Sequence, residues 1–479
     1  MKFPGFCGPT YQSRSIFADA QRCINLYPEL IESGTGKSGA ALYRTPGLEV
    51  FASSFGGVDD AVSGMIEING RCFAMVGAMF CEIASDGSTS VGPLPVGGGS
   101  GDDVRMAASD TELVILYNGN IYSFDLATDN MTAVGSPGDN LTGLVWIDNY
   151  FVALKTDTQQ IYISALNDGT SWDELDFASA EGRPDNLIDL AVINRELWLF
   201  GTRSIQPYYN TGDADFPFGP VPGTLLERGG IGKTVVGLDN TLFWCSAGER
   251  GAGMIWRAEG FRPVRISNHS VEYSLQAVDD LEDAVAWGYE DGGHTFYCIH
   301  TPNLDRTWCF DVATGLWHER AYWNAVSGQY ERHRGNIHCY AFGKHLVADH
   351  TDSIVYEMSR DHYDDNGDSI RWARRMPYLS NEGKRIFHNS LELDMETAVG
   401  TALVINPTVS LRWSNDHGST WNTAITRPIG PYAAGASSQV RVRWNLLGSA
   451  RDRVYEVYGT DAVNIALMEA YLDVTPGEH

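Results

Sequence analysis

A hairpin unit that recurs between residues 60 and 360 constrains the fold more than any other feature of the sequence. Each unit has an apolar strand, a tight turn, a second strand, a variable loop and a third strand, as in "LVILYNGNIYSFD" (113–125) and "FVALKTDTQQIYISA" (151–165). An aromatic residue closes each hairpin, at Phe80, Tyr122, Tyr162, Tyr208, Trp256, Trp308 and Tyr356. Successive positions are 40 to 52 residues apart, which is enough for a four-stranded blade.

Blades of this kind bury their faces only by stacking on neighbours, and closing them into a ring leaves few free strand edges. We therefore predict an all-β fold: a six- or seven-bladed β-propeller over residues 56–360 and a smaller C-terminal β-rich platform domain over residues 361–479. Residues 1–55 precede the repeat and form an N-terminal arm, which either joins the platform or closes the propeller. A pair of β-sandwiches with an accidental periodicity is the alternative fold.

Charge is unevenly divided between these parts. The chain has 34 Lys and Arg against 61 Asp and Glu, a formal net charge of −27. From Arg371 to His479, 11 basic and 11 acidic residues cancel, so the whole excess of acid lies in the first 370 residues. Such a field repels DNA and anionic lipid at long range. It argues against a protein that grips DNA, but not against a wall along which DNA slides.

The cysteines and apolar segments indicate where the protein is made. Eight cysteines without a Cys-x-x-Cys pair are sparse for 479 residues, which is typical of reduced core thiols in a cytoplasmic product. The first residues, "MKFPGFCGPT", have Pro and Gly where a signal peptide needs an apolar run. No apolar stretch reaches about 18 residues, so we expect no membrane span.

Residues 414–421, "SNDHGSTW", fit the Asp-box pattern best known from sialidases. Asp and Ser side chains can bond the backbone of their own turn, Gly accepts a positive φ, and Trp packs beneath the turn. We interpret the box as a structural turn formed by Ser414, Asp416, Gly418, Thr420 and Trp421.

Two alternative functions remain open at this stage. A sialidase-like glycosidase or lectin would fit the Asp box, but a glycosidase needs paired carboxylates or a Tyr nucleophile with a carboxylate base, and no local pattern singles these out. A Kelch-like scaffold would fit Gly292-Gly293 followed by Trp317 within one unit.

The sequence has no strong catalytic or metal-binding motif. Nucleophile-elbow, zinc-protease and dinucleotide-binding patterns are all absent. We therefore predict no catalytic residues, no metal and no cofactor. Ligand-type residues do crowd residues 294–350, without the close paired spacing of a zinc module: His294, His300, His318, His333, His338, Cys339, His345 and His350.

Eight stretches taken together resemble one protein family. They are "CINLYPE" (23–29), "YRTPGL" (43–48), "SWDELDFASAEGRPDNL" (171–187), "LWLFGTRSI" (197–205), "GGHTFY" (292–297), "TWCFDVATGLWHER" (307–320), "LRWSNDHGSTW" (411–421) and "LGSARDRVYEV" (447–457). The set is similar to the packaged-DNA stabilisation proteins of short-tailed bacteriophages, also called tail-nozzle or tail-hub proteins. The similarity spans nearly the whole chain in the same order.

This resemblance implies a structural virion protein of the phage tail, made in the cytoplasm of the host bacterium and without enzymatic activity. Such proteins form a homo-oligomeric ring, usually a hexamer, below the portal and adaptor proteins. The ring prolongs the DNA channel, helps to retain packaged DNA, and carries tail fibres, spikes or a needle. Double-stranded DNA would pass through the channel without specific binding.

Six arginines of the neutral C-terminal domain are the candidate partner-docking residues. Arginine suits interfaces because its planar group can bond a carboxylate through two parallel hydrogen bonds. The alternative is that they are ordinary solvated surface charges. The six are Arg374, Arg375, Arg441, Arg443, Arg451 and Arg453.

Overall fold

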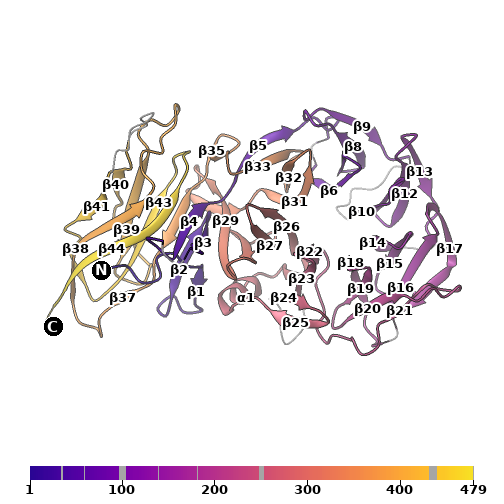
Figure 1. Ribbon diagram of the computed structural model, residues 1–479, viewed down its shortest axis with the longest axis horizontal. Helices are drawn as coiled ribbons and strands as arrows, with labels where there is room; N and C mark the ends of the chain where they lie inside the picture. The colour runs from indigo at the N-terminus through magenta and orange to yellow at the C-terminus, as the bar shows by residue number, and fades with distance from the viewer. Residues whose placement is uncertain are drawn as a thin grey trace.

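Seven blades, each with four antiparallel strands, form a closed ring in the part of the chain that the structure describes (Figure 1). Five blades are separate sheets, and the other two are parts of larger sheets. The structure is a computed structural model, and it describes residues 1–33, 36–58, 60–95, 104–138, 140–180, 182–246, 253–430 and 440–477. The innermost strand of each sheet contacts the innermost strand of the next, and the last contacts the first. This is the arrangement of a β-propeller, and we number its sheets as blades 1 to 7.

Blades 1 to 5 are made of consecutive strands, each joined to the next by a short connection. Blade 1 contains β6 (Val62–Ile68), β7 (Arg71–Val76), β8 (Met79–Ile83) and β9 (Thr89–Pro93). Blade 2 contains β10 (Val104–Ala108), β11 (Glu112–Tyr117), β12 (Asn120–Asp125) and β13 (Asn130–Val134). Blade 3 contains β14 (Leu141–Ile147), β15 (Tyr150–Lys155), β16 (Gln160–Ala165) and β17 (Asp168–Ser179). Blade 4 contains β18 (Leu187–Ile193), β19 (Glu196–Gly201), β20 (Ile205–Asn210) and β21 (Phe218–Pro220). Blade 5 contains β22 (Val236–Leu238), β23 (Thr241–Ser246), β24 (Met254–Glu259) and β25 (Arg262–Arg265).

Blades 6 and 7 carry additional strands. Blade 6 contains β26 (Val285–Asp291), β27 (His294–His300), β28 (Thr307–Asp311) and β29 (Leu316–Asn324), and β30 (Gln329–Arg332) pairs with β29. Helix α1 (His269–Gln276) and the 3-10 turn η1 (Leu281–Asp283) precede this blade. Blade 7 contains β31 (Gly335–Ala341), β32 (Lys344–Asp349), β33 (Val355–Ser359) and β5 (Gly47–Ala52), extended by β34 (Asp364–Asp365) and β35 (Asp368–Ser369).

The predicted repeat corresponds to these blades. All seven hairpin-closing aromatic residues lie on the third strand of a blade, and all but the half-buried Phe80 are buried. One such residue lies in each of the seven blades, so the propeller has the larger of the two predicted blade numbers. The contacts of Phe80 show how blades stack, because its ring lies 4.9 Å from that of Phe124 in the next blade.

Two-residue turns with positive φ at both positions close the first hairpin of six blades among the described residues. Such turns match the twist of the paired strands, and Asn, Asp and Gly adopt them at little cost. They account for the turn residues between the apolar strands of the repeat. The six pairs are Asn69-Gly70, Asp148-Asn149, Asn194-Arg195, Asp239-Asn240, Gly292-Gly293 and Phe342-Gly343.

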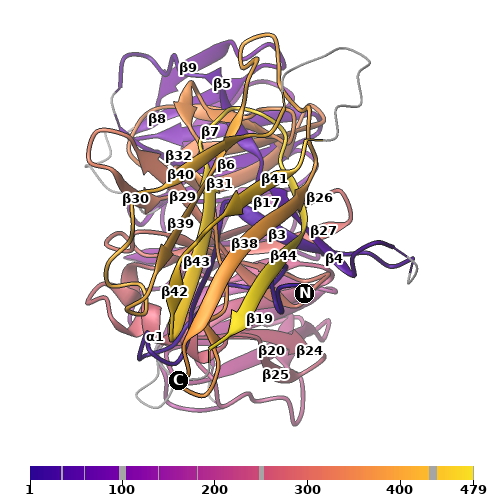
Figure 2. The ribbon, with the colours of Figure 1, turned by 90° about the vertical axis from the view of Figure 1, so that its left-hand side faces the viewer.

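The C-terminal part is a β-sandwich of two sheets at one side of the ring, where both chain ends also lie (Figures 1 and 2). Sheet one contains β2 (Ala20–Ile24), β36 (Trp372–Arg375), β43 (Asp452–Gly459), β39 (Thr408–Ser414) and β40 (Ile425–Pro428), with β1 (Tyr11–Gln12) and β37 (Leu379–Ser380) beside it. Sheet two contains β3 (Leu26–Leu30), β4 (Ala40–Arg44), β44 (Ala466–Pro476), β38 (Ile386–Met395), β41 (Val442–Asn445) and β42 (Ser449–Ala450). Their inner faces share one core, which includes Leu391, Trp444, Tyr455, Val457 and Leu472.

The N-terminal arm enters both halves of the molecule. Strands β2 to β4 belong to the sandwich, whereas β5 is the outer strand of blade 7 and pairs antiparallel with β33. The crossing from sheet one to sheet two is at Asn25, whose buried side chain bonds the backbone of Ala321 and Arg371. Because β2 also pairs with β29, sheet one continues into blade 6. The arm thus supplies strands to the sandwich and closes the ring.

Candidate functional site

Three of the six candidate docking arginines are directed into their own chain. Arg374 is completely buried and donates to backbone carbonyls of the arm, including Phe6 at 2.6 Å and Gly5 at 2.7 Å. Arg453 is 2% exposed and donates to the carbonyl of Leu447 at 2.6 Å. Arg375 pairs with the buried carboxylate of Glu456 at 2.9 Å. All three lie on central strands of sheet one. Because their guanidinium groups are used inside the chain, the structure corrects the prediction that these three dock a partner at the surface.

The other three arginines are exposed on sheet two or at its end. Arg443 lies on β41, where Nη2 donates to Ser390 Oγ at 2.7 Å and Nη1 lies 3.8 Å from Glu392 Oε2. Two large apolar side chains are exposed beside this strand, Phe387 at 47% and Leu446 at 92%. We call the following set the arginine edge: Arg441, Arg443, Arg451, Phe387 and Leu446.

Leu446 has an unusual backbone, with φ of 60°. A left-handed conformation is rare for a bulky residue and costs free energy, so it persists only where neighbouring bonds hold it. Here the amide of Leu446 donates to the carbonyl of Asn389 at 2.8 Å, and the next amide donates to His388 at 3.0 Å. The fold thus holds an apolar side chain in solvent at the arginine edge.

The Asp box forms a self-contained turn after β39. Asp416 accepts from Ser414 Oγ at 2.6 Å and from the Thr420 amide at 2.8 Å, and Gly418 has a φ of 92°. These hydrogen bonds, led by that from Ser414, lower the pKa of Asp416 to about 2. The Trp421 Nε1 donates to the Gly418 carbonyl at 3.1 Å. The carboxylate is therefore occupied by hydrogen bonds within its own turn.

A second stretch in blade 3 forms a related turn, with the same bond from Trp to Gly. Asp168 accepts from the Thr170 amide at 2.9 Å, and Trp172 Nε1 donates to the Gly169 carbonyl at 2.8 Å. This stretch, "NDGTSW" (167–172), is the degenerate relative of the box in the sequence. The motif is thus used twice for the same purpose, once in each half of the molecule.

Two buried carboxylates form ion networks that the sequence did not single out. Glu319 is fully buried and accepts from Arg22 at 3.0 Å, while Arg306 lies 3.1 Å away. Burial alone would raise its pKa, but the two guanidinium groups hold the pKa of Glu319 below its usual range. Glu456 is placed in the same way between Arg375 and Arg412. The Glu319 network joins blade 6 to the arm.

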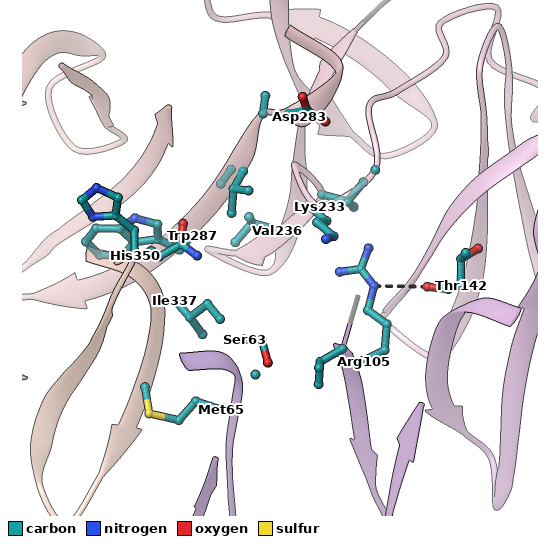
Figure 3. Close-up of a pocket in the computed structure, with 18 of the residues that line it drawn as sticks. Ser63, Met65, Arg105, Thr142, Lys233, Val236, Asp283, Trp287, Ile337 and His350 are labelled. Carbon is teal, nitrogen blue, oxygen red and sulfur yellow. Dashed lines mark hydrogen bonds between the residues drawn. The ribbon is translucent and has the colours of Figure 1, made fainter. Parts of the chain in front are cut away.

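The inner strands of the blades enclose a cavity of about 940 Å³ at the centre of the ring (Figure 3). Arg105 and Lys233 project toward one another in it (Figure 3). Arg105 Nη2 lies 3.3 Å from Asp189, which also accepts from the Lys233 amide at 3.1 Å. Among the residues that the structure describes, no group of three or more His, Cys, Asp or Glu could hold a metal ion.

The fold and these sites define a class of protein: a β-propeller scaffold tied to a β-sandwich, with most of its buried charges used in internal networks. The sequence matches the family descriptions "Bacteriophage P22 Gp10, beta-propeller" over residues 1–363 and "Bacteriophage P22 Gp10, beta-sandwich" over residues 371–475. The chain therefore belongs to the bacteriophage P22 Gp10 family and is a structural protein of the phage tail, which confirms the predicted family and fold class.

Comparisons beyond the family concern the fold. No curated protein matches the chain. The extracellular domain of the putative hybrid two component system BT4673 from B. thetaiotaomicron has a TM-score of 0.44 and 8% identity, over 66% of this chain and 40% of that one. The WD40 domain of Neurospora crassa Pan2 has a TM-score of 0.42 and 6% identity, over 66% of this chain and 94% of that one. Among the described residues, no helix is long and apolar enough to cross a membrane.

Proposed function

We propose that this chain is the subunit of a tail nozzle or hub ring, which extends the portal channel, helps to retain packaged DNA and anchors the tail appendages. The observation that carries the proposal is the family match over both halves of the chain. Its direct partners would be further copies of itself, the portal and adaptor proteins, and a fibre, spike or needle protein. We expect six copies in the ring.

Charge complementarity supports a contact between neighbouring copies. The propeller half holds the whole excess of acid, whereas the sandwich half is neutral and exposes the arginine edge. A contact between two different patches of the same chain generates a ring when its rotation closes. We propose that the arginine edge of one copy meets the acidic propeller of the next, with Leu446 as its apolar anchor.

The same charge distribution suits the passage of DNA. Proteins that hold DNA do so largely with Lys and Arg, which displace counterions from the phosphates. A ring whose wall is acidic offers no such affinity, so DNA would meet little resistance during ejection. Retention would then depend on closing the channel rather than on binding its contents.

The test is assembly with and without the arginine edge. Purified chain mixed with a portal–adaptor complex should add a ring of density in negative-stain images. The double variant Arg443→Glu, Leu446→Asp should abolish this ring while circular dichroism is unchanged. Arg195→Glu is the matched control, because Arg195 is 83% exposed on the propeller and, within the described part of the chain, its only ion pair is with Asp148. Absence of the ring with the unaltered chain would refute the proposed function; a ring that survives the double variant would refute only the arginine edge.

A further inference from the structure

One part-buried arginine of the central cavity has no negative charge in direct contact. Arg332, at the end of β30, lines the cavity. Among the residues that the structure describes, no carboxylate oxygen lies within 4.0 Å of it. Its one hydrogen bond is from Nη2 to the neutral Asn336 Oδ1 at 3.0 Å, and its buried Nε has no partner. Burial lowers the pKa of Arg332 to about 10, so it remains charged at neutral pH.

The one acid whose charge acts noticeably on Arg332 among the described residues, Asp349, is bonded to other groups. Asp349 is fully buried, and its oxygens accept from the Thr351 amide at 2.8 Å and the Tyr356 hydroxyl at 2.9 Å. It also pairs with Arg334 at 3.3 Å. Asp349 already has a cation and four hydrogen-bond donors, so Arg332, which is part-buried, is left without a carboxylate in direct contact. Charges removed from water in proteins are usually paired, so a part-buried guanidinium without a counterion is a candidate for an anion partner.

Two neighbours of Arg332 in the cavity each keep one polar side-chain atom without a partner among the described residues. Asn336 Oδ1 accepts from both Arg332 and His300 Nε2, at 3.0 Å each, which leaves the amide Nδ2 of Asn336 without a partner among the described residues. His350, labelled at one side of Figure 3, uses Nδ1 to bond the Arg334 carbonyl at 3.1 Å. Its Nε2 is therefore left for the cavity. Arg332, Asn336 and His350 all line this space.

We propose that Arg332, Asn336 and His350 bind a small oxyanion, with the chemistry of phosphate or a carboxylate, inside the propeller cavity. The guanidinium supplies the charge and the Asn336 amide donates a hydrogen bond. His350 Nδ1 donates to the Arg334 carbonyl, so Nε2 donates to the anion only in the protonated ring, which burial disfavours by lowering the pKa of His350. The acids of the cavity lining, Asp157, Glu282 and Asp283, are exposed and form no ion pair with Arg332. The site is distinct from the arginine edge and does not depend on ring assembly.

Isothermal titration calorimetry with inorganic phosphate tests this on the full chain at low ionic strength, near pH 5.5, where His350 is more readily protonated. We expect binding at about millimolar affinity or better. Arg332→Gln should weaken it at least about tenfold, since a bond to a charged group is lost. Arg332→Lys should retain part of the affinity. Asn336→Asp keeps the acceptor for Arg332 and His300 but adds an internal negative charge, so it should abolish binding.

The matched control is Arg195→Gln, which makes the same change of charge on the outside of the propeller and should bind phosphate like the parent. Circular dichroism establishes that each variant is folded. A parallel titration with acetate shows whether the site prefers phosphate or a carboxylate. Competition between phosphate and acetate for the same site would support the proposal. No heat from either anion with the parent chain, or equal phosphate affinity in the parent, Arg332→Gln and Asn336→Asp, would overturn it.

Discussion

Replacing Arg374 with methionine should loosen the N-terminal arm from the sandwich. The guanidinium of Arg374 is completely buried in sheet one, and its three nitrogens make five hydrogen bonds to the arm. Methionine has a similar length and is apolar, so the change removes the donors while keeping most of the packing. The acceptors that would lose their donor are Gly5, Phe6, Pro9, Arg22 and Gln21.

The expected loss is about 3 kcal/mol in the free energy of unfolding. A buried acceptor left without a donor costs about 1–3 kcal/mol, and four of the five acceptors are backbone carbonyls. The sum overstates the loss, because the variant no longer buries a cation. That burial cost is real, since desolvation lowers the pKa of Arg374. Breaking a buried charged network by removing one partner typically costs about 3–5 kcal/mol, and we take the lower limit.

Urea unfolding followed by tryptophan fluorescence measures the global loss, and trypsin cleavage after the exposed Arg14 measures release of the arm. Arg451→Met is the control, because Arg451 is exposed and bonds only the Gly383 carbonyl, so it should change stability by less than about 0.5 kcal/mol. Arg374→Lys, which keeps the charge with fewer donors, should fall between the two. Equal stability and equal cleavage rates for Arg374→Met and Arg451→Met would refute the reasoning.

Three further predictions concern pH and the closure of the ring. Burial raises the pKa of Asp365 to about 7, so its contribution to stability is fully present below about pH 4 and is lost as the pH rises through 7. In urea titrations, the free energy of unfolding of Asp365→Asn should exceed that of the parent by about 2–4 kcal/mol at pH 8 and should equal it at pH 4. Burial lowers the pKa of His338 to about 3, so its contribution to stability is lost as the pH falls below its unfolded pKa of about 6.5. Between about pH 7.5 and 5, the free energy of unfolding should therefore fall by about 2 kcal/mol less in His338→Gln than in the parent. A Cβ added to Gly47 would lie 2.5 Å from the Asp364 carbonyl, so in thermal unfolding Gly47→Ala should cost about 1–3 kcal/mol, whereas Gly92→Ala, with no neighbour within 4 Å, should cost less than about 0.5 kcal/mol.

Each of these comparisons has an outcome that contradicts its argument. Equal urea midpoints for Asp365→Asn and the parent at pH 8 would mean that this carboxyl finds a charge partner in solution. An unchanged pH dependence in His338→Gln would mean that the imidazole is reached by water. Equal thermal shifts for the two glycine variants would mean that β5 can move away from β34 without loss.

The propeller could be predicted because its signals are local. A turn such as Asn69-Gly70 recurs in six blades and the aromatic residue on the third strand recurs in all seven, so each copy supports the others. Tyr122 and Trp308 occupy equivalent positions in blades 2 and 6 although the sequences around them differ. The signal survives because stacked blades need the same buried position in every unit.

The use of the arm could not be read from the sequence. Alternation of apolar and polar residues shows which face of a strand is buried, but it does not name the neighbouring strand. Ile24 lies opposite Glu319 on one side and Ala373 on the other, both far along the chain. A segment with strand-like alternation could therefore join the platform or close the ring, and only the structure shows that it does both.

For a related reason, the sequence could not separate the exposed candidate docking arginines from the buried ones. Residue type shows that Arg374 and Arg443 are charged, but not that one meets backbone carbonyls while the other faces solvent. A better signal was present at residues 318–320, where His318, Glu319 and Arg320 follow one another in a strand. Consecutive side chains point to opposite faces, so polar residues on both faces of a predicted blade strand indicate a buried network.

The arm also makes the two halves of the molecule depend on one another. The family descriptions divide the chain between residues 363 and 371, yet β4 ends at Arg44 in the sandwich and β5 begins at Gly47 in blade 7. Arg44 itself bonds the carbonyl of Val463 on the sandwich side and that of Tyr363 next to blade 7. Opening the ring at β5 would therefore pull on β4 and expose the sandwich core, so the closed propeller is stabilised by a domain that contributes none of its inner strands.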